Sequence, residues 1–286
     1  MKVVTAVVNN PIFIEIQYHT LKKYFKGDYE FIVFNDAKDF PDFTNDGDVT
    51  IRQKIESLCN SLNIRCVNIP NEQHKTTQCA AVRAADSMNY ILNYQKQNPD
   101  KYLLIDSDMF LIDHFDVSKY DPYSCAIVLQ SRGPNSSLHY FWNGIYYFDF
   151  EKLTNTELLN WNCCDKCDVG GMMQKWLKTQ IAEADIPNTD DLRWTPKTFF
   201  TDKIYFIKHL WSCTWNLSEL PENLKNRQEL INFFKEDPRN VNDKFFCEIY
   251  DNVFLHYRAG GNWMKEGLTL HNQLSEKLKA VLLTNL

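Results

Sequence analysis

The strongest constraint on the fold is a regular alternation of strand-type and helix-type segments over the first 112 residues of this 286-residue chain. Short β-branched and apolar runs are separated by longer segments in which apolar residues recur every three or four positions. This alternation predicts a parallel sheet covered by helices, because a crossover helix usually joins neighbouring parallel strands. We therefore predict an α/β fold with a Rossmann-like, mostly parallel central sheet.

Individual elements follow from the same signals. We expect strands at residues 3–8, 30–35, 64–69 and 102–105 and helices at 11–27, 51–62 and 80–92. Asn10 supplies a helix cap and Pro11 suits a first helical turn, which fixes the start of the first helix. The strand at 102–105 is apolar throughout, as expected for a central parallel strand that is covered on both faces.

Beyond residue 113 the alternation weakens, and no internal repeat or low-complexity tract marks a domain boundary. Strands are expected at 125–130, 140–148, 203–208 and 253–257 and one helix at 169–184, with polar loops at 188–200 and 218–243. We therefore predict one continuous domain with a C-terminal elaboration.

Composition excludes several classes of protein. The 31 basic and 37 acidic residues give a net charge of -6 without any block of like charge, so we expect no nucleic-acid partner. No apolar stretch approaches the roughly 20 residues of a membrane span, and the N-terminus lacks the apolar region of a signal peptide. We expect a cytoplasmic protein. The odd count of nine cysteines, most of them placed singly, is typical of reduced thiols.

Three of these cysteines cluster at Cys163, Cys164 and Cys167. Their C-x-x-C spacing is compatible with zinc, but the sequence has no second C-x-x-C pair. His209 and Cys213 are the only distant complement. Plain loop thiols are the favoured interpretation.

Two carboxylates, Asp106 and Asp108, directly follow the strand at 102–105. Because side chains alternate faces along a strand, both point the same way while Ser107 points away. Two desolvated carboxylates so close together require a proton, a cationic side chain or a metal between them. Ligands of open α/β sheets bind at the carboxyl ends of strands, which favours a divalent ion here. The alternative is a turn cap at Asp106 and a solvated Asp108.

A second polar cluster lies in VFLHYRAGGNWMKEG, residues 253–267. His256 and Arg258 are expected on one face of a strand, Gly260 and Gly261 allow the backbone to approach a ligand, and Lys265 follows. Such a set suits an anionic, metal-bound ligand such as a diphosphate. A core histidine followed by an ordinary Gly-Gly turn is the alternative.

Taken in order, these features resemble the nucleotide-sugar-dependent glycosyltransferases of the GT-A fold. The resemblance covers residues 1–265 and includes the D-S-D motif at 106–108, an Asn-Gly hairpin at 142–144 and the late His256 before Trp263. The ending HYRAGGNW is similar to that of the glycogenin-like branch. The resemblance implies a single domain over 1–286, with a nucleotide-binding half at 1–112, an acceptor-binding half and metal-closing strand at 113–268, and a C-terminal helix at 269–286.

The resemblance also implies a cofactor and substrates. Asp106, Asp108 and His256 become ligands of Mn²⁺ or Mg²⁺, and the imidazole suits Mn²⁺ at least as well as Mg²⁺. The donor is a nucleotide-diphosphate sugar, with UDP as the expected nucleotide, and the acceptor is a hydroxyl of a glycan or another molecule. Arg258 or Lys265 would add positive charge beside the departing diphosphate.

The implied donor-binding residues extend beyond the metal site. The nucleotide-sugar set comprises Val8, Asn9, Asn10, Asp36, Arg83, Asp106, Ser107, Asn143, Gly144, Arg258, Gly260, Gly261 and Lys265. Two of them have competing interpretations. Asp36 is equally compatible with a turn aspartate, and Arg83 with a solvated surface arginine.

The resemblance implies a catalytic carboxylate just before the helix at 169, where Asp165 and Asp168 are the candidates. An inverting enzyme would use it as general base, and a retaining enzyme would use it to stabilise an oxocarbenium-like transition state. Asp168 is favoured, although capping of the helix is an equal alternative. The sequence CCDKCDVGG departs from the family's acidic, glutamine-containing pattern at this point.

Three other classes compete with this interpretation. Haloacid-dehalogenase-like phosphatases also place D-x-D after a strand, but nearer the start and with a later G-D-x-x-x-D that this chain lacks. Nucleotidyltransferases need a glycine-rich loop after the first strand, where VVNNPIFIE has no glycine. The third class is a catalytically inactive protein of the same fold that binds sugar nucleotides or carbohydrates. The intact triad of Asp106, Asp108 and His256 favours an active enzyme over such a protein.

Overall fold

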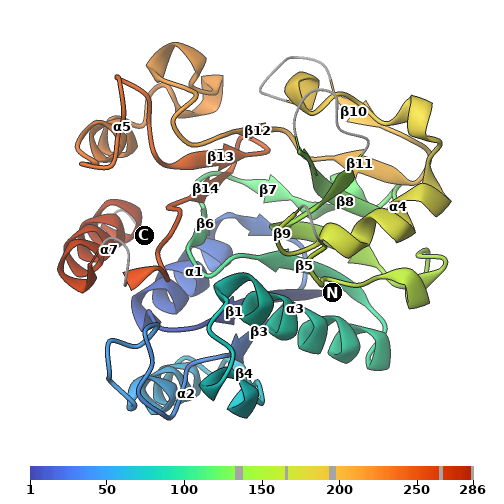
Figure 1. Ribbon diagram of the computed structural model, residues 1–286. Coiled ribbons are helices and arrows are strands. Elements are labelled where there is room, and N and C mark those ends of the chain that lie inside the picture. Colours follow the sequence, from blue (N-terminus) through green and yellow to red (C-terminus); the bar gives the residue numbers. More distant parts are fainter. Residues whose placement is uncertain (133–137, 165–166, 193–197, 264–266, 285–286) are drawn as a thin grey trace.

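The computed structural model describes residues 1–132, 138–164, 167–192, 198–263 and 267–284. Its centre is an eight-stranded sheet with the order β10-β11-β8-β9-β5-β1-β3-β4 (Figure 1). Neighbouring strands pair in parallel except around β9 and β10. The strands are β1 (Lys2–Val7), β3 (Glu30–Asn35), β4 (Arg65–Asn68), β5 (Lys101–Ile105), β8 (Cys125–Ser131), β9 (His139–Asp149), β10 (Phe199–Phe200) and β11 (Ile204–Phe206).

Helices cover both faces of this sheet. Helices α1 (Pro11–Tyr24) and α2 (Ile51–Ser61) pack with Val3 and Val7 of β1 in one buried cluster. Helices α3 (Ala80–Gln97) and α4 (Gln174–Gln180) pack with Val4 in another. Because β1 supplies apolar side chains to both clusters, it cannot show the polar alternation of a half-exposed strand. The predicted α/β architecture is confirmed.

A smaller antiparallel sheet adjoins the first, with the order β12-β13-β14-β6. Its strands are β6 (Met109–Leu111), β12 (His209–Leu210), β13 (Glu248–Tyr250) and β14 (Phe254–His256). Helices α5 (Gln228–Lys235) and α7 (Leu268–Leu283) share a third buried cluster with this sheet and with α1. Strand β2 (Phe25–Lys26) pairs with β7 (Phe115–Asp116).

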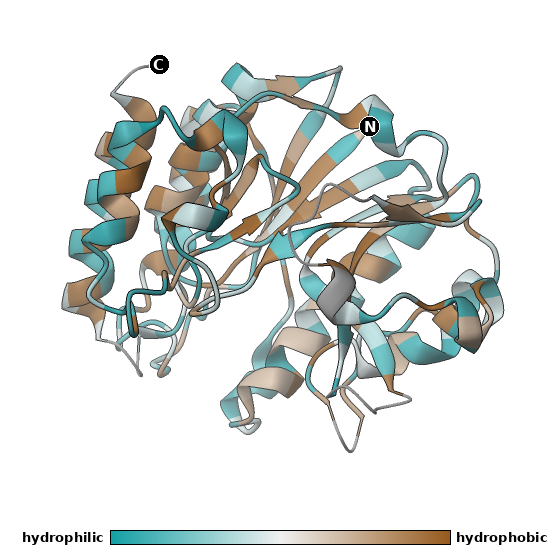
Figure 2. Cartoon of the chain, turned by 90° about the horizontal axis from the view of Figure 1, so that it is seen from above, coloured by the Kyte–Doolittle hydropathy of each residue, from teal (hydrophilic) through white to brown (hydrophobic). Residues whose placement is uncertain are grey.

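Short 3-10 helices complete the elements: η1 (Glu72–Lys75), η2 (Val117–Tyr120), η3 (Thr156–Leu158), η4 (Gly171–Met173), η5 (Glu183–Asp185), η6 (Thr189–Leu192), η7 (Leu217–Glu219) and η8 (Glu222–Leu224). Figure 2 shows hydrophobic residues concentrated in the strands and hydrophilic ones on the outer sides of the helices. Within the described part of the chain, every helix is too short or too polar to cross a bilayer.

The start of the first helix is confirmed, since the Asn10 side chain accepts a hydrogen bond from Ile12 N and Pro11 opens the helix. Its predicted end at Gly27 is wrong. The helix stops at Tyr24, because the chain turns directly into β2.

Three predictions in the second half of the chain are also wrong. The helix at 169–184 shrinks to η4 and α4, because Gly170 adopts a left-handed backbone with φ of +90°. The loop at 218–243 contains α5, which buries Leu230, Ile231, Phe233 and Phe234. The loop at 188–200 includes η6 and β10, apart from residues 193–197, which lie outside the described residues.

The prediction that the Asn-Gly pair at 143–144 forms a hairpin turn is wrong. The pair lies inside β9. Strands β8 and β9 form the antiparallel pair, and their register shifts between Ile127 and Leu129, opposite this part of β9. Such irregularities redirect side chains next to binding sites. This one lies beside the carboxylates described below.

Candidate metal centre and its flanking cavities

Asp106 and Asp108 lie in the short link between β5 and β6, and His256 ends β14. Strand β14 pairs with β6 so that His256 is opposite Met109, which brings the imidazole to Asp108. The His256 Nε2 atom is 3.0 Å from Asp108 Oδ1 and 3.9 Å from Asp106 Oδ2. One ligand atom from each residue lies within 4.8 Å of the others. The pairing of two strands thus assembles the predicted triad.

This cluster fits a divalent metal. In an octahedral site with ligands near 2.1 Å, adjacent ligand atoms are about 3 Å apart and opposite ones about 4 Å apart. The distances from His256 Nε2 fall in that range. Two carboxylates and one imidazole are ligands that Mn²⁺ accepts readily. Asp108 and His256 are buried whereas the Asp106 side chain is 36% exposed, so the site opens on its Asp106 side.

The charges within the cluster are strongly coupled. Burial and the Asp108 carboxylate raise the pKa of Asp106 to about 7. Burial opposes ionisation of Asp108, but His256 and the Gly260 N–H outweigh it and lower its pKa. Burial alone would lower the pKa of His256, yet the Asp108 and Glu248 carboxylates raise it. The two carboxylates are therefore stabilised together by a positive charge, which a protonated His256 or a metal ion would supply, or by a proton on Asp106.

Glu248 on β13 holds His256 from behind, and sequence analysis missed it. Its Oε2 atom is 2.7 Å from His256 Nδ1 and accepts a hydrogen bond from the Tyr250 hydroxyl at 2.8 Å. With Nδ1 bound to Glu248, Nε2 is directed toward Asp108. The sequence offered only a weak signal, the Asp251-Asn252 pair between two apolar runs; in the structure both residues have positive φ in the turn that joins β13 and β14.

The glycine pair closes the other side of Asp108. The Gly260 N–H donates to Asp108 Oδ2 at 2.7 Å, and a Cβ at Gly260 would lie 2.5 Å from the Phe13 ring. A Cβ at Gly261 would lie 3.1 Å from Val8. The two glycines therefore allow their backbone to pack closely against the side chains of Phe13 and Val8. Arg258 has φ of +66° beyond the end of β14, so the prediction that it shares a strand face with His256 is wrong.

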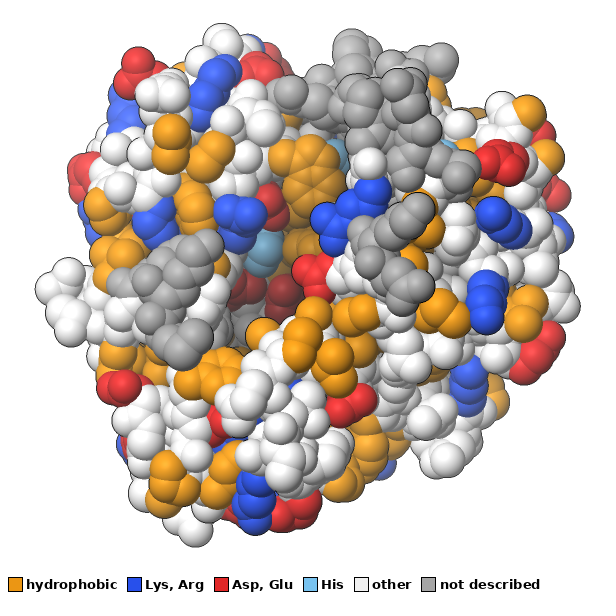
Figure 3. Space-filling model, viewed as in Figure 1, with side chains coloured by type: hydrophobic (Ala, Val, Ile, Leu, Met, Phe, Trp, Pro, Cys, Tyr) orange, Lys and Arg blue, Asp and Glu red, His pale blue; other side chains and the backbone are white. Residues whose placement is uncertain are grey.

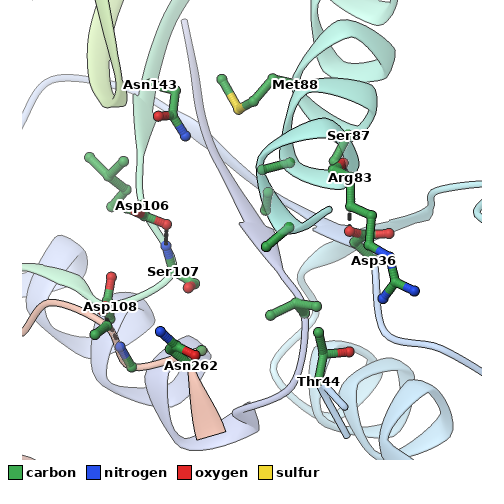
Figure 4. Close-up of a pocket in the computed structure, with 18 of the residues that line it drawn as sticks. Asp36, Thr44, Arg83, Ser87, Met88, Asp106, Ser107, Asp108, Asn143 and Asn262 are labelled. Carbon is green, nitrogen blue, oxygen red and sulfur yellow. Dashed lines mark hydrogen bonds between the residues drawn. The ribbon is translucent and has the colours of Figure 1, made fainter. Parts of the chain in front are cut away.

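A first cavity of about 370 Å³ opens beside the triad. Of the predicted site residues, its lining includes Val8, Asp36, Arg83, Asp106, Ser107, Asp108, Asn143, His256, Gly260 and Gly261. Figure 4 shows the segment 106–108 on one side of this cavity and Asp36, Arg83 and Ser87 on the other. In the space-filling view, acidic and histidine side chains lie at the bottom of a central hollow (Figure 3).

Asp36 and Arg83 are both buried. The Asp36 carboxylate accepts hydrogen bonds from Lys38 Nζ at 2.7 Å and from Ser87 Oγ at 2.7 Å. Arg83 donates twice to the Asp42 carboxylate, at 2.8 and 3.0 Å, and to the carbonyl oxygens of two residues of the preceding segment. The alternative of a solvated surface arginine is therefore wrong. Both side chains build the cavity wall through contacts within the protein.

Two other predicted residues lie behind the cavity. The Asn9 side chain donates to Gly261 O at 2.9 Å, and Asn10 donates to Ser275 Oγ of α7 at 2.9 Å. Gly144 O accepts from Asp106 N at 2.7 Å. Asn9 thus holds the glycine turn, Asn10 links the start of α1 to α7, and the Asp106 amide is tied to β9.

The catalytic candidates are less well defined by the structure. Asp168 is exposed, and its Oδ1 accepts from the next backbone N–H, that of Val169. The alternative that it caps the following helix is wrong, because Met173 occupies the N-cap of α4. Asp165 and Lys265 lie outside the described residues.

A second cavity, of about 390 Å³, shares Trp142 and His256 with the first. The rest of its lining is Leu129, Gln130, Ser131, Arg132, Tyr140, Thr189, Trp211, Glu248 and Arg258. Arg258 belongs to this cavity, whereas the lining of the first does not include it. All three residues of the candidate metal centre thus line the first cavity, and His256 also lines the second.

The cysteine cluster does not form a comparable centre. Cys164 Sγ lies 3.0 Å from Cys167 Sγ, and all nine cysteines are free. His209, the proposed complement, contacts Trp211 instead. Within the described ranges, Asp106, Asp108 and His256 are the one group of three side chains with the spacing of metal ligands.

Comparison with known proteins adds little. Neither the family models nor the curated proteins gave a match. Among solved structures, an active-site mutant of LgtC is 14% identical over 53% of this chain and 58% of its own, with a TM-score of 0.38. The galactosyltransferase LgtC in complex with donor and acceptor sugar analogs is 13% identical over 56% and 62%, with a TM-score of 0.37. The chain thus spans less than two thirds of each of these structures.

Proposed function

We propose that the protein is a metal-dependent glycosyltransferase of the GT-A fold. It would move a sugar from a nucleotide-diphosphate sugar, with UDP as the expected nucleotide, to a hydroxyl group of a glycan or another acceptor. The observation that carries the proposal is the convergence of Asp106, Asp108 and His256 between two cavities. A transferase needs this arrangement, because donor and acceptor must meet at one anomeric carbon.

The first cavity suits the donor. It lies at the carboxyl ends of β1, β3 and β5, where nucleotides bind in open α/β sheets, and it combines apolar walls with Asp36, Ser107 and Asn143. The diphosphate would lie nearest the triad. A Mn²⁺ or Mg²⁺ ion held by Asp106, Asp108 and His256 would act there as a Lewis acid that stabilises the departing diphosphate.

The chemistry assigned to the site is a single substitution at the anomeric carbon. The acceptor oxygen forms a bond to that carbon, and the carbon–oxygen bond to the diphosphate breaks, with its electron pair leaving on the nucleotide. The hydroxyl proton passes to a base. Glu248 is engaged by His256 and Tyr250 and is therefore a positioning residue. Asp168, which neither cavity lining includes, remains a prediction for the carboxylate.

Calorimetry measures the binding of UDP and GDP, and an activity assay measures the hydrolysis of their sugars. Both are carried out with Mn²⁺ and with EDTA. We expect binding and slow hydrolysis with Mn²⁺ and neither with EDTA. Asp108→Asn should abolish both, because it removes a charged ligand. Asp113→Asn is the matched control, since Asp113 follows β6 and bonds to Asn223 away from the triad.

Two results would contradict the proposal in different ways. Wild-type protein that binds no nucleotide in the presence of Mn²⁺ would contradict it outright. Metal-dependent binding without hydrolysis or transfer would identify a sugar-nucleotide-binding protein instead.

A further inference from the structure

The second cavity lies across Trp142 from the proposed donor site, and we infer that it receives an acceptor carrying a negative charge. The ligand class is an acidic sugar, whose charge is a carboxylate or a phosphate. This inference rests on the proposed function and specifies its acceptor.

The position of the cavity links it to the reaction. It shares Trp142 and His256 with the first cavity, so a molecule inside it lies directly beside the metal centre. Its volume of about 390 Å³ falls within the range of about 300–1,000 Å³ that is usual for small-molecule sites. A sugar bound there could present a hydroxyl group to a donor in the first cavity.

Aromatic rings form one wall. Trp142 stacks on Tyr250 with ring centres 4.8 Å apart and meets Trp211 edge to face at 6.1 Å. Trp142 and Trp211 are half-buried, so part of each ring remains accessible. Because each ring is held by its neighbours, the wall is rigid. Pyranose rings expose apolar C–H faces that pack on such surfaces.

Two guanidinium groups supply the charge. Arg132 is exposed, stacks over Tyr140 at 5.8 Å and has no ion-pair partner among the described residues. Arg258 is 43% exposed and donates from Nη1 to Ser212 Oγ at 3.1 Å, with Nε 3.5 Å from Glu248. A guanidinium has five N–H donors, so each arginine retains donors for a ligand. Figure 3 shows basic side chains on two sides of the central hollow.

The lining has little negative charge to balance these arginines. Glu248 is the one acidic side chain among its described residues. Its Oε2 atom is engaged by His256 and Tyr250 and its Oε1 atom pairs with Arg258, so one carboxylate faces two arginines. This excess of positive charge is local, because the chain as a whole has a net charge of -6. Guanidinium groups match carboxylate and phosphate oxygens with paired hydrogen bonds. A neutral sugar would leave those donors without an anionic partner.

Calorimetry measures how tightly three sugars bind to the wild-type protein in the presence of Mn²⁺ and UDP. The sugars are methyl glucuronide, methyl glucoside 6-phosphate and neutral methyl glucoside. We expect at least one acidic sugar to bind about tenfold tighter than the neutral one, as a charge-assisted hydrogen bond provides. The tighter of the two acids distinguishes carboxylate from phosphate. Arg132→Gln and Arg258→Gln should each reduce the acid-to-neutral ratio, and the double variant should bring it to about one. Arg65→Gln, which removes an exposed arginine paired with Glu30, should leave the ratio unchanged.

Equal binding of the three sugars, or binding of none, overturns the inference while metal-dependent nucleotide binding still supports the proposed function. An Arg258→Gln variant that binds UDP more weakly but keeps the wild-type ratio also overturns it, because Arg258 would then serve the donor diphosphate. Loss of nucleotide binding in the wild type is the separate failure of the proposed function.

Discussion

Trp142 separates the two cavities, and its position depends on the glycine two residues later. The Trp142 ring lies directly over Gly144, where an added Cβ would be 2.1 Å from the nearest ring carbon. Real atoms do not approach so closely, so any side chain at 144 must displace the ring. This is the physical reason for an Asn-Gly pair inside a strand, where glycine normally weakens the pairing.

Gly144→Ala is therefore expected to destabilise the protein by about 1–3 kcal/mol, the usual cost of overpacking. It should also weaken acceptor binding, since the displaced ring forms a wall of the second cavity. Urea unfolding followed by tryptophan fluorescence measures the first effect. In a Trp142→Phe background the same change should cost less, because the clash is smaller. Equal costs in both backgrounds would show that the ring can move freely.

Glu248 lies behind His256, and the affinity of the site for metal should depend on it. It fixes the imidazole of His256 through Nδ1, and partners of this kind typically contribute 10–100-fold to metal affinity. Glu248→Gln should lower the affinity for Mn²⁺ by about that factor, as measured by calorimetry. Tyr250→Phe, which removes one hydrogen bond to Glu248 but keeps the carboxylate, should have a smaller effect. Wild-type Mn²⁺ affinity in Glu248→Gln would exclude this orienting role.

The three candidate metal ligands were predictable from sequence, whereas the residues that support them were not. Asp106 and Asp108 directly follow an apolar strand, which marked them as a site, although they lie in the turn to β6 and not on a continuing strand as predicted. His256 was assigned to the site by its resemblance to the late histidine of GT-A glycosyltransferases, in the ending HYRAGGNW. Glu248 reaches His256 only through the antiparallel pairing of β13 and β14, which are three residues each and too short for a periodic signal. Arg132 lies at the end of β8, where nothing in its neighbourhood indicates a cavity.

At the scale of elements, α3 lines the first cavity across from the candidate triad, and η1 is bonded to α3 through Arg83. The carbonyl oxygen of His74 in η1 accepts from Arg83 in α3, while the His74 ring is fully buried and contacts Asp86 at 3.2 Å. Burial and the Lys38 ammonium lower the pKa of His74 despite Asp86. The imidazole therefore resists protonation in the folded protein.

The sign of the resulting pH dependence follows from linkage. Above about pH 7.5, one unit over the pKa of a free histidine, the ring is neutral in both the folded and the unfolded chain, so it contributes no pH dependence. Below that pH the unfolded chain binds the proton first, and the free energy of unfolding falls by up to about 1.4 kcal/mol per pH unit. His74→Gln should remove this component, as measured by urea unfolding between pH 5.5 and 7.5. The same change at the exposed His114 should not. A wild type that gains stability over His74→Gln on acidification would show that Asp86 holds the proton on His74.

The elements that sequence predicted well are those whose own pattern was long enough to be decisive. The strands at β1, β3 and β5 and helices α1, α2 and α3 have several periodic apolar residues each. Helix α5 was missed although Leu230, Ile231, Phe233 and Phe234 recur at helical spacing, because polar residues surround that short segment. Helix α4 was predicted too long, because the backbone of Gly170 breaks it before its first turn. Tertiary contacts decide such short elements.

At the scale of the whole molecule, the metal centre joins segments that are distant in sequence. His256 contacts Asp108 across 148 residues, because His256 ends β14 and Asp108 directly precedes β6, the strand that pairs with β14. Asn10 and α7 reach the same region through the Asn10–Ser275 hydrogen bond. The unfolded chain contains no such site, so a metal bound here stabilises the folded state as a whole.

Mn²⁺ alone should therefore raise the free energy of unfolding, and UDP should raise it further only when Mn²⁺ is present. At a hundredfold excess over its dissociation constant, each ligand contributes about 2.7 kcal/mol. The denaturant dependence of unfolding should stay constant, because the surface exposed on unfolding does not change. Asp108→Asn should remove both increments by deleting a metal ligand that the Gly260 N–H and His256 hold in place. Stabilisation by UDP that persists in EDTA would mean that the nucleotide is held by the walls of the first cavity without the metal, and the triad would then lose its assigned role in donor binding.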